Sequence, residues 1–478
     1  MSDRNIPIFF AAQSYKARSG LLSAERVVNL YAEDTIYVPE SKSKVALFRT
    51  PGALPWKNLE NYNPIYGMIV MGEFLYVVCG LSLYKINTSM SANLIGTLST
   101  APDRVQMTEN GTQVTILTSS GISYYYNVNT NTFGQITSPN YKSSISVTTL
   151  DGYTIFAREF SQEFFISANN DTTTYAALDF ASAEAKSDNL LAVLNYNRQL
   201  VLFGSTSIEF WYDTGNQTFP FERIDGALID KGTAATNSAV GDVTGFYFLG
   251  SDKIIYQCSS YQPQRISTYG VEKAINSYER INDAFAFIYT QEGHKFYCLT
   301  FPSANKTWCY DINTKLWHER ESRNALMQVN RWIANCHASF ANKELIGSNL
   351  AGKIYELNLD YAKEDQNPLI CEAISATQFY DYYRTSFNKF ILWMDTGVGI
   401  DGSGQGDNPQ IMLQVSTDGG KTWSNELWQA LGEIGQYDQE VWWDQIGFGR
   451  NLLLKIIVSD PVKVAINGAL LNLTIGRS

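Results

Sequence analysis

A pair of short hydrophobic runs, joined by a turn rich in glycine and serine, recurs along the first three quarters of the chain. The second run of each pair carries an aromatic residue. Six copies are clear, at 76–86, 114–128, 200–214, 246–258, 296–312 and 344–358, and a weaker one occupies 153–167. Glycine and serine tolerate the backbone angles of a tight turn, so each copy predicts a β-hairpin.

The spacing of the copies indicates a series of similar units. Successive copies are 40 to 54 residues apart when their second runs are marked by Tyr84, Tyr125, Phe165, Trp211, Tyr256, Tyr310 and Tyr355. A β-propeller blade has four strands in about 40–50 residues, so one hairpin supplies half a blade. Runs such as 144–150 and 190–196 would supply further strands. We therefore predict an all-β protein with a β-propeller of about seven blades. The weak third copy leaves six blades open, and an irregular β-rich array is the alternative.

The pattern changes beyond residue 370. Strand-like runs at 384–397, 409–424 and 452–476 alternate with Gly and Asp turns, which predicts a small C-terminal β-sandwich-like domain. The first 60 residues have turn residues but no long periodic segment, and we expect an extended lead-in that packs on the first blade. The predicted division is a lead-in over 1–60, a propeller over 61–370 and a C-terminal β domain over 371–478.

The composition favours a chain that is covered by neighbours. Charged residues make up 17% of the 478 residues, below the roughly 25% usual for soluble domains, and aromatic residues make up 13%. Interfaces are poor in Lys and Glu and rich in aromatic residues, although a β-rich fold also favours aromatic residues. The net charge of −11 and the lack of a basic run give the chain no general attraction for nucleic acid.

The cysteines and the apolar segments exclude several other classes. Six scattered cysteines without a CxxC pair, beside only three histidines, argue against a zinc site and are typical of buried thiols made in a reducing compartment. The N-terminal apolar stretch is too short for a signal peptide, and no segment approaches the ~20 apolar residues of a membrane span. We expect a soluble protein that is not secreted by the standard route.

The stretch VSTDGGKTWS at 415–424 fits the Asp-box pattern known from sialidases. Its aspartate can accept hydrogen bonds from the following NH groups, its two glycines allow unusual backbone angles, and its tryptophan can fold over the loop. Sialidases carry such boxes away from their catalytic centres, so we interpret the motif as a structural turn and predict no catalytic residue. The residues of this turn are Ser416, Asp418, Gly420, Thr422 and Trp423.

Other motifs for chemistry are weak. GSTSI at 204–208 lacks the final glycine of GxSxG, and no phosphate-binding loop occurs. His318 belongs to the charged run HERESR, which is more often a solvated loop than a catalytic site. We predict no enzymatic activity.

The run DGSGQGD at 401–407 begins like a calcium-binding EF-hand loop. It places Asp401, Ser403 and Gln405 at alternating positions, but its twelfth position is Met412, where calcium needs a bidentate acid. A flexible hairpin loop is the alternative, and we predict neither a metal nor a cofactor.

Several short segments, taken in order, resemble the tail hub proteins of short-tailed bacteriophages, also called packaged-DNA stabilisation proteins. Those segments are similar to the family's early strand and Pro-Gly turn, its central hairpin and Lys-Gly turn, and its closing strands. They are VVNLYAE (27–33), ALFRTPGALP (46–55), FGSTSIEFWYDTG (203–215), ALIDKGTAA (227–235), and 415–424 with 441–473.

The resemblance implies a structural virion protein. Family members form a ring of six copies, the tail hub or nozzle, which extends the DNA channel below the portal and its adaptor. The ring retains the packaged genome until ejection and carries tail spikes or fibres and a needle or tip. DNA passes without sequence-specific contact, and the chain itself does not insert into a membrane. The resemblance also implies assembly in the host cytoplasm and a final place in the virion tail.

The charge of the chain is compatible with that role. A closed ring with an anionic wall would repel DNA phosphates and let a duplex slide past. The main alternative is a carbohydrate-binding or sialidase-like propeller that uses the Asp-box domain. A scaffold propeller that binds host peptides is a further alternative.

Overall fold

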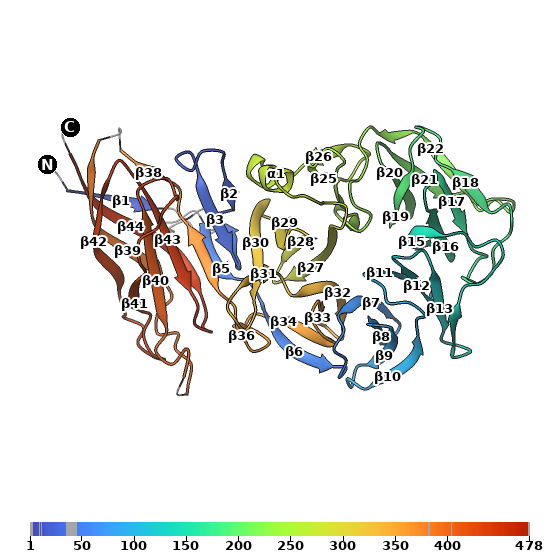
Figure 1. Ribbon diagram of the computed structural model, residues 1–478, viewed down its shortest axis with the longest axis horizontal. Helices are drawn as coiled ribbons and strands as arrows, with labels where there is room; N and C mark the ends of the chain where they lie inside the picture. Colours follow the sequence, from blue (N-terminus) through green and yellow to red (C-terminus); the bar gives the residue numbers. More distant parts are fainter. Residues whose placement is uncertain are drawn as a thin grey trace.

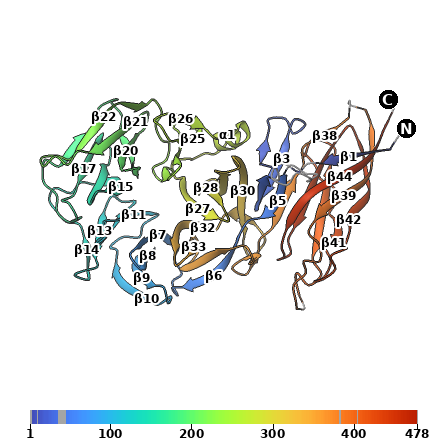
Figure 2. The same cartoon turned by 180° about the vertical axis from the view of Figure 1, so that it is seen from behind.

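The computed structural model describes residues 3–8, 10, 12–34, 45–380, 383–402 and 404–476. They form an elongated molecule made almost entirely of β-strands, with a propeller at one end and a sandwich at the other (Figures 1 and 2). The single α-helix of these ranges, α1 (Tyr269–Asn276), lies between the fifth and sixth blades. No helix in this part of the chain is long and apolar enough to cross a membrane.

The propeller has seven four-stranded blades within the described residues, which confirms the predicted β-propeller of about seven blades. The first strand of each blade contacts the first strand of the next, and that of the last blade contacts that of the first, so the ring is closed. The blades are β7–β10 (Ile65–Met71, Phe74–Cys79, Ser82–Asn87, Ala92–Thr97), β11–β14 (Val105–Glu109, Gln113–Thr118, Ser123–Asn127, Thr132–Gln135), β15–β18 (Ser144–Leu150, Tyr153–Arg158, Glu163–Ile166, Phe180–Ser182), β19–β22 (Leu190–Tyr196, Gln199–Gly204, Ile208–Asp213, Phe221–Ile229), β23–β26 (Val240–Asp242, Gly245–Leu249, Ile255–Cys258, Pro263–Arg265), β27–β30 (Phe285–Gln291, His294–Phe301, Lys306–Asp311, Leu316–Arg323), and β32, β33, β34 and β6 (Ala334–Phe340, Lys343–Ser348, Lys353–Asn358, Gly52–Asn58).

Each hairpin of the sequence repeat forms the second and third strands of one blade. The aromatic residue of its second run packs in the hydrophobic layer of the ring: the Trp211 ring, for example, meets Phe164 of the preceding blade with the ring centroids 5.0 Å apart. The weak copy at 153–167 is also a blade hairpin. Its turn places Phe160, and not a glycine, at a φ of 53°, which is why the glycine signal is missing there.

The lead-in of residues 1–60, which we expected to pack on the first blade, is distributed over three places. Strand β6 pairs antiparallel with β34 and completes the last blade, so the beginning and the end of the propeller share one sheet. Without β6 the backbone of β34 would be left as an unpaired edge. The lead-in also supplies β1 (Asp3–Ile8), β4 (Leu30–Asp34) and β5 (Val45–Arg49) to the sandwich, and β3 (Ala24–Val28) to the junction of the two domains.

The C-terminal domain is a β-sandwich, as predicted, but it includes those N-terminal strands. One sheet has the order β4-β5-β44-β39-β42, with β1 also paired to β44; the other contains β3-β37-β43-β40-β41, with β2 and β38 at its sides. Buried side chains from both sheets, among them Phe390, Trp443, Leu454 and Leu471, form one core. The remaining bounds are β2 (Tyr15–Lys16), β31 (Val329–Arg331), β35 (Lys363–Glu364), β36 (Asn367–Pro368), β37 (Cys371–Ile374), β38 (Gln378–Phe379), β39 (Thr385–Met394), β40 (Gln410–Ser416), β41 (Leu427–Ala430), β42 (Val441–Gly449), β43 (Asn451–Val458) and β44 (Ala465–Ile475).

Strand β3 lies at the boundary between the two domains. β3 lies between β30, the outer strand of the sixth blade, and β37 of the sandwich, and it is hydrogen-bonded on both sides. One sheet therefore runs from the propeller through β3 into the sandwich. Because β3 is hydrogen-bonded to both domains, it resists their relative movement.

The axis of the propeller is filled by side chains. The Gln106 amide of the second blade donates to Asn237 Oδ1 (2.9 Å), next to the fifth blade. Arg104 donates to the backbone carbonyl of Asn335 (2.9 Å) and stacks 3.4 Å above the Phe285 ring centroid. A cavity of about 140 Å³ remains beside Arg104. The expected anionic bore therefore does not run through the ring of blades, because these side chains bridge the axis.

Candidate functional site

The five residues that the sequence singled out lie together, Ser416 at the end of β40 and the other four in the loop that follows it. Asp418 Oδ1 accepts hydrogen bonds from the backbone NH groups of Lys421 (2.9 Å) and Thr422 (3.0 Å), and the Thr422 hydroxyl donates to Asp418 Oδ2 (2.6 Å). Ser416 Oγ donates to Asp418 Oδ1 (2.7 Å). The hydrogen bonds from Thr422 hold the pKa of Asp418 well below its usual range. The loop thus uses its carboxylate entirely to close its own turn.

The same loop forms one wall of a cleft between the two domains. Its glycine backbone touches the lead-in so closely that a Cβ on Gly20 would lie 2.0 Å from the Gly419 carbonyl oxygen. Trp423 is half-buried, and Lys455 Nζ of β43 lies 4.3 Å from its ring centroid. The Asp box therefore connects β40 to the lead-in and positions two side chains at the rim of the cleft.

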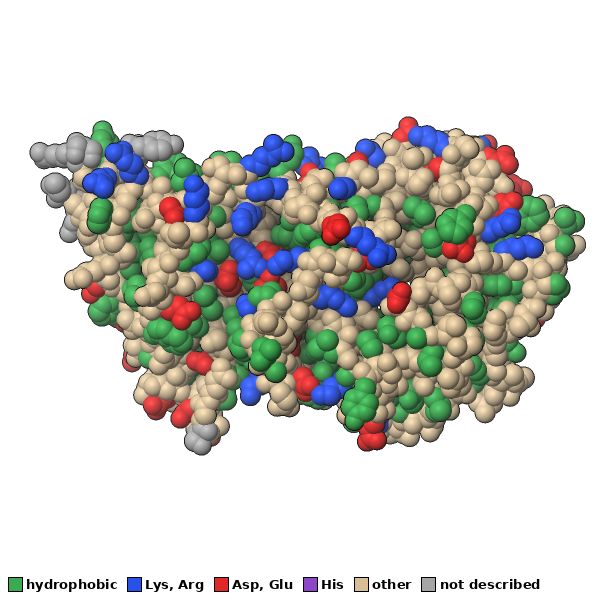
Figure 3. Space-filling model, in the orientation of Figure 1, with side chains coloured by type: hydrophobic (Ala, Val, Ile, Leu, Met, Phe, Trp, Pro, Cys, Tyr) green, Lys and Arg blue, Asp and Glu red, His purple; other side chains and the backbone are tan. Residues whose placement is uncertain are grey.

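The cleft encloses about 1,130 Å³. Its walls are the segment before β3 together with β3 itself, the sixth blade with α1, and the Asp-box loop with β43. Figure 3 shows Lys and Arg side chains gathered around a hollow between the sandwich and the propeller. Seven Lys or Arg and five Asp or Glu residues line the cleft, a local excess of positive charge in a chain whose net charge is −11.

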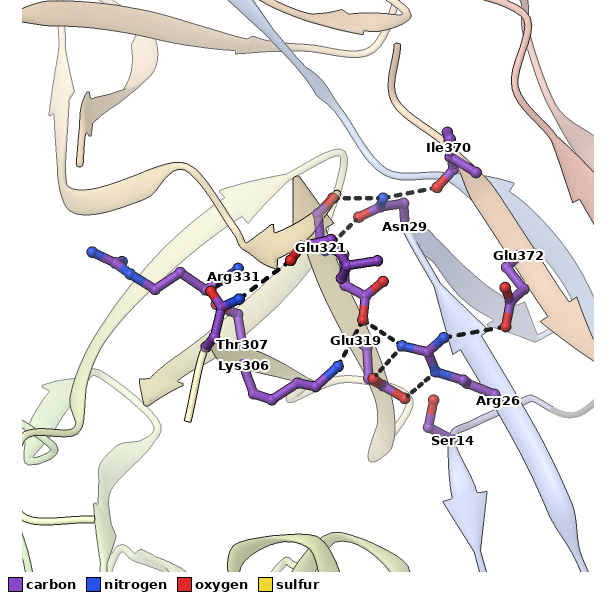
Figure 4. A network of polar contacts seen from close by, with 12 residues as sticks. Ser14, Arg26, Asn29, Lys306, Thr307, Glu319, Glu321, Arg331, Ile370 and Glu372 are labelled. Carbon is purple, nitrogen blue, oxygen red and sulfur yellow. Dashed lines mark hydrogen bonds and ion pairs between the residues drawn. The ribbon is translucent and has the colours of Figure 1, made fainter. Parts of the chain in front are cut away.

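The floor of the cleft holds an ion-pair network centred on Arg26 of β3 (Figure 4). The guanidinium makes a two-pronged contact with Glu319 of β30, with Nε–Oε1 at 3.0 Å and Nη2–Oε2 at 2.8 Å. It also pairs with Glu321 of the same strand and with Glu372 of β37, the latter at 3.2 Å. Lys306 Nζ of the neighbouring strand β29 lies 2.9 Å from Glu321 Oε1. One arginine thus binds carboxylates from both domains.

Charge compensation sets the protonation of this network. Burial alone would lower the pKa of Arg26, but the attraction of the three carboxylates outweighs it and holds the pKa above its ordinary value. Burial alone would raise the pKa of Glu321, but Arg26 and Lys306 hold it below the usual range. Arg26 and Glu321 therefore each favour the charged form of the other, and the pair stays ionised at neutral pH.

Asn29, the asparagine of the VVNLYAE segment, reinforces the same junction. It separates β3 from β4 with a left-handed φ of 53°, and its buried side chain bonds two separate parts of the chain. The amide donates to the carbonyls of Glu321 (2.9 Å) and Ile370 (2.8 Å), and its Oδ1 accepts from the Glu321 NH (3.1 Å). Asn29 therefore connects the propeller to the segment that enters the sandwich.

The prediction of a solvated loop for HERESR is wrong. These residues belong to β30, and His318, Glu319, Arg320 and Glu321 are all buried. Burial is possible because the charges have partners: Arg320, for instance, stacks 3.9 Å above the Trp332 ring centroid and donates to the Pro51 carbonyl at 3.0 Å. The signal that could have revealed the strand is its position, since it follows the hairpin at 296–312 where the fourth strand of that blade belongs.

The geometry does not favour a sialidase site. Such a site needs arginines that are free to bind a substrate carboxylate, and Arg26 is saturated by three glutamates. The other arginine of the cleft lining is Arg18. The cleft therefore lacks the arginine cluster that this chemistry requires.

The run at 401–407 shows no ligand cluster for calcium. Asp401 is exposed, the Gln405 amide donates to the Ser459 carbonyl (3.3 Å), and Met412 is buried within β40. Ser403 lies outside the described residues. No group of three or more His, Cys, Asp or Glu side chains suited to a metal occurs in the described ranges.

The cysteines are free thiols, as the sequence predicted. Cys336 is half-buried and the other five are buried. Cys298 and Cys309 face each other on neighbouring strands, and their sulfur atoms are 2.9 Å apart.

Comparison with known proteins gives the same two domains. Residues 67–362 match the family model described as "Bacteriophage P22 Gp10, beta-propeller", and residues 374–474 match the model described as "Bacteriophage P22 Gp10, beta-sandwich". No curated protein matches the sequence.

Similar solved structures have low sequence identity. The computationally designed Ika8 protein aligns with 64% of this chain and 99% of its own at 8% identity and a TM-score of 0.42. PorZ of Porphyromonas gingivalis, a bacterial surface component of the type-IX secretion system, aligns with 65% of this chain at 12% identity and a TM-score of 0.37. The extracellular domain of the putative hybrid two-component system BT4673 from B. thetaiotaomicron aligns with 75% at 9% identity and a TM-score of 0.43. This chain covers 38% of the PorZ chain and 42% of the BT4673 chain.

Proposed function

The chain belongs to the bacteriophage P22 Gp10 family of packaged-DNA stabilisation proteins, structural components of the phage tail, and from this we propose that copies of it assemble into the tail hub. The ring contains six copies, lies below the portal and its adaptor, and extends the DNA channel. It retains the packaged genome and carries tail spikes or fibres and a needle or tip. The observation that carries this proposal is the match of one chain to both the propeller and the sandwich of the family.

The path of the DNA follows from the filled propeller axis. Gln106 and Arg104 bridge that axis, so a duplex cannot pass through one chain and the channel lies between copies. The net charge of −11 makes the surfaces around this channel repel phosphates, which lets the duplex move without sequence-specific contact. Low charge and many aromatic residues suit a subunit that is contacted on several sides.

The junction between the domains suits a ring that has to withstand pressure. The sheet that passes through β3 and the network of Arg26 hold the propeller and the sandwich in one orientation. A ring under the pressure of packaged DNA needs such a fixed orientation, because the channel keeps its shape only if the domains of each copy do not move relative to one another. We propose no catalytic role.

Assembly on the portal–adaptor complex of its own phage tests the proposal. The purified chain is mixed with that complex at micromolar concentration, and native mass spectrometry and negative-stain microscopy count the bound copies. We expect a ring of six below the adaptor and no turnover of sialic-acid substrates by the same preparation. A chain that stays monomeric beside the complex, or that hydrolyses such substrates, would overturn the hub.

A further inference from the structure

The rim of the interdomain cleft carries cations that the protein itself does not neutralise. Lys16, Arg18, Lys273 and Lys421 are exposed there, and Lys455 is half-buried. Among the described residues none of these five has a carboxylate within ion-pair distance, whereas Arg26 and Lys306 on the floor are occupied by glutamates. The rim is therefore open to an acidic partner.

The rim is also partly apolar. Leu21 is 54% exposed and Val329 is 39% exposed, and both line the cleft together with Tyr278 and Trp308. A partner that fits this surface combines negative charge with exposed hydrophobic side chains.

The chain carries one such segment. The loop at 432–440 between β41 and β42 contains Glu433, Asp438 and Glu440, all exposed and without a cation in ion-pair distance among the described residues. Ile434 is 60% exposed and Tyr437 is 73% exposed. The stretch 422–449 contains no Lys or Arg at all. Figure 3 shows acidic side chains along the lower edge of the sandwich end.

A copy cannot place this loop in its own cleft. Ala430, just before the loop, pairs with Gln410 at the start of β40, whereas the Asp box begins at Ser416, where β40 ends. The two ends of β40 are separated by seven residues of extended strand, about 20 Å, so the loop and the Asp box lie at opposite ends of this strand. The loop is also held at its end of the sandwich, because the Thr396 hydroxyl donates to the Tyr437 carbonyl at 2.9 Å.

We propose that the loop 432–440 of one copy docks in the interdomain cleft of the next copy. The contact joins two different surfaces, so it is a head-to-tail contact of the kind that closes a cyclic ring. The opposite charges of the loop and the rim attract the two copies and fix their relative position. Ile434 and Tyr437 cover the apolar part of the rim. This inference rests on the proposed function, since it supplies the contact between copies of the hub.

A reciprocal charge exchange tests the contact. The cleft variant carries Arg18→Glu and Lys421→Glu, and the loop variant carries Glu433→Lys and Asp438→Lys. All four side chains are exposed, so both variants should keep the melting temperature of the wild type. Each variant alone opposes like charges, and we expect the protein concentration needed for ring formation on the portal–adaptor complex to rise about tenfold or more.

Mixing the two variants gives the decisive result. In an equimolar mixture each loop meets a cleft of opposite charge, so alternating rings should form at the wild-type concentration. The matched control carries Lys142→Glu and Arg223→Glu, both exposed on the propeller away from the cleft, and should assemble like the wild type.

The outcomes separate this inference from the proposed function. Rings that form normally from either variant alone would overturn the docking contact, while the proposed function as a tail hub would remain supported. Loss of assembly by the cleft variant that the loop variant does not rescue would also overturn it, since the occupant would then be an acidic segment of the adaptor. Failure of the wild type to form rings on the complex would overturn both.

Discussion

Replacement of Arg26 by methionine removes a charge that pairs with carboxylates of both domains. Methionine retains much of the packing volume but removes the charge. The three glutamate side chains around it are only 9%, 3% and 16% exposed. Removing one partner of a buried ion pair costs about 3–5 kcal/mol, because an uncompensated charge stays behind. Arg26 itself is 27% exposed and Lys306 remains beside Glu321, so we expect the lower end, about 3 kcal/mol.

The assay is differential scanning calorimetry of the variant and the wild type at about pH 7.5 and about pH 3. In the wild type the network holds the pKa of Glu321 below its ordinary value of 4.5, so its stabilisation is present above 4.5 and is lost as the pH falls further, through the lower pKa of the folded state. The difference in melting temperature between wild type and variant should therefore be large at the higher pH and smaller at the lower pH.

A surface ion pair supplies the matched control. Arg198 pairs with Asp151 at 2.8 Å, and its side chain is 80% exposed. Arg198→Met should cost between 0 and about 1 kcal/mol, because solvent screens exposed pairs. If Arg26→Met lowered the melting temperature no more than Arg198→Met, or by the same amount at both pH values, the account of the junction would be refuted.

Three further predictions concern single side chains. Asn29→Ala leaves buried backbone groups without partners and should cost about 2–4 kcal/mol; an unchanged melting temperature would contradict this. Asp418→Ala should lower the melting temperature of the sandwich without affecting any sugar-related activity, while Asp418→Asn should lower it less; unchanged melting with loss of such an activity would show that the turn is a functional site. The hydrogen bond with Asp311 raises the pKa of His294 above 6.5, so its stabilisation is complete below that value and is lost as the pH rises through the folded-state pKa. The melting difference between wild type and His294→Gln should therefore be larger at about pH 6 than at about pH 9, and a pH-independent difference would be the contrary result.

The propeller could be predicted from the sequence because its repeating unit is a short local pattern. Each blade hairpin is encoded by about fifteen consecutive residues, which form two hydrophobic runs and a turn. The number of these repeats gives the number of blades. The runs at 144–150 and 190–196 are strands β15 and β19 with those bounds. The Asp-box turn could also be predicted, because Asp418 forms hydrogen bonds with residues only two to four positions away.

The junction and its cleft depended on the tertiary structure. β6 closes the ring by pairing Gly52 with Asn358, and nothing near either residue specifies the other. The charged run in β30 looked solvated because charges without partners stay in water. Its main partner, Arg26, lies 293 residues earlier than Glu319 in the chain. Short-range patterns thus determined the strands and turns, while the folded chain alone decided which charges are buried and which remain exposed at the rim.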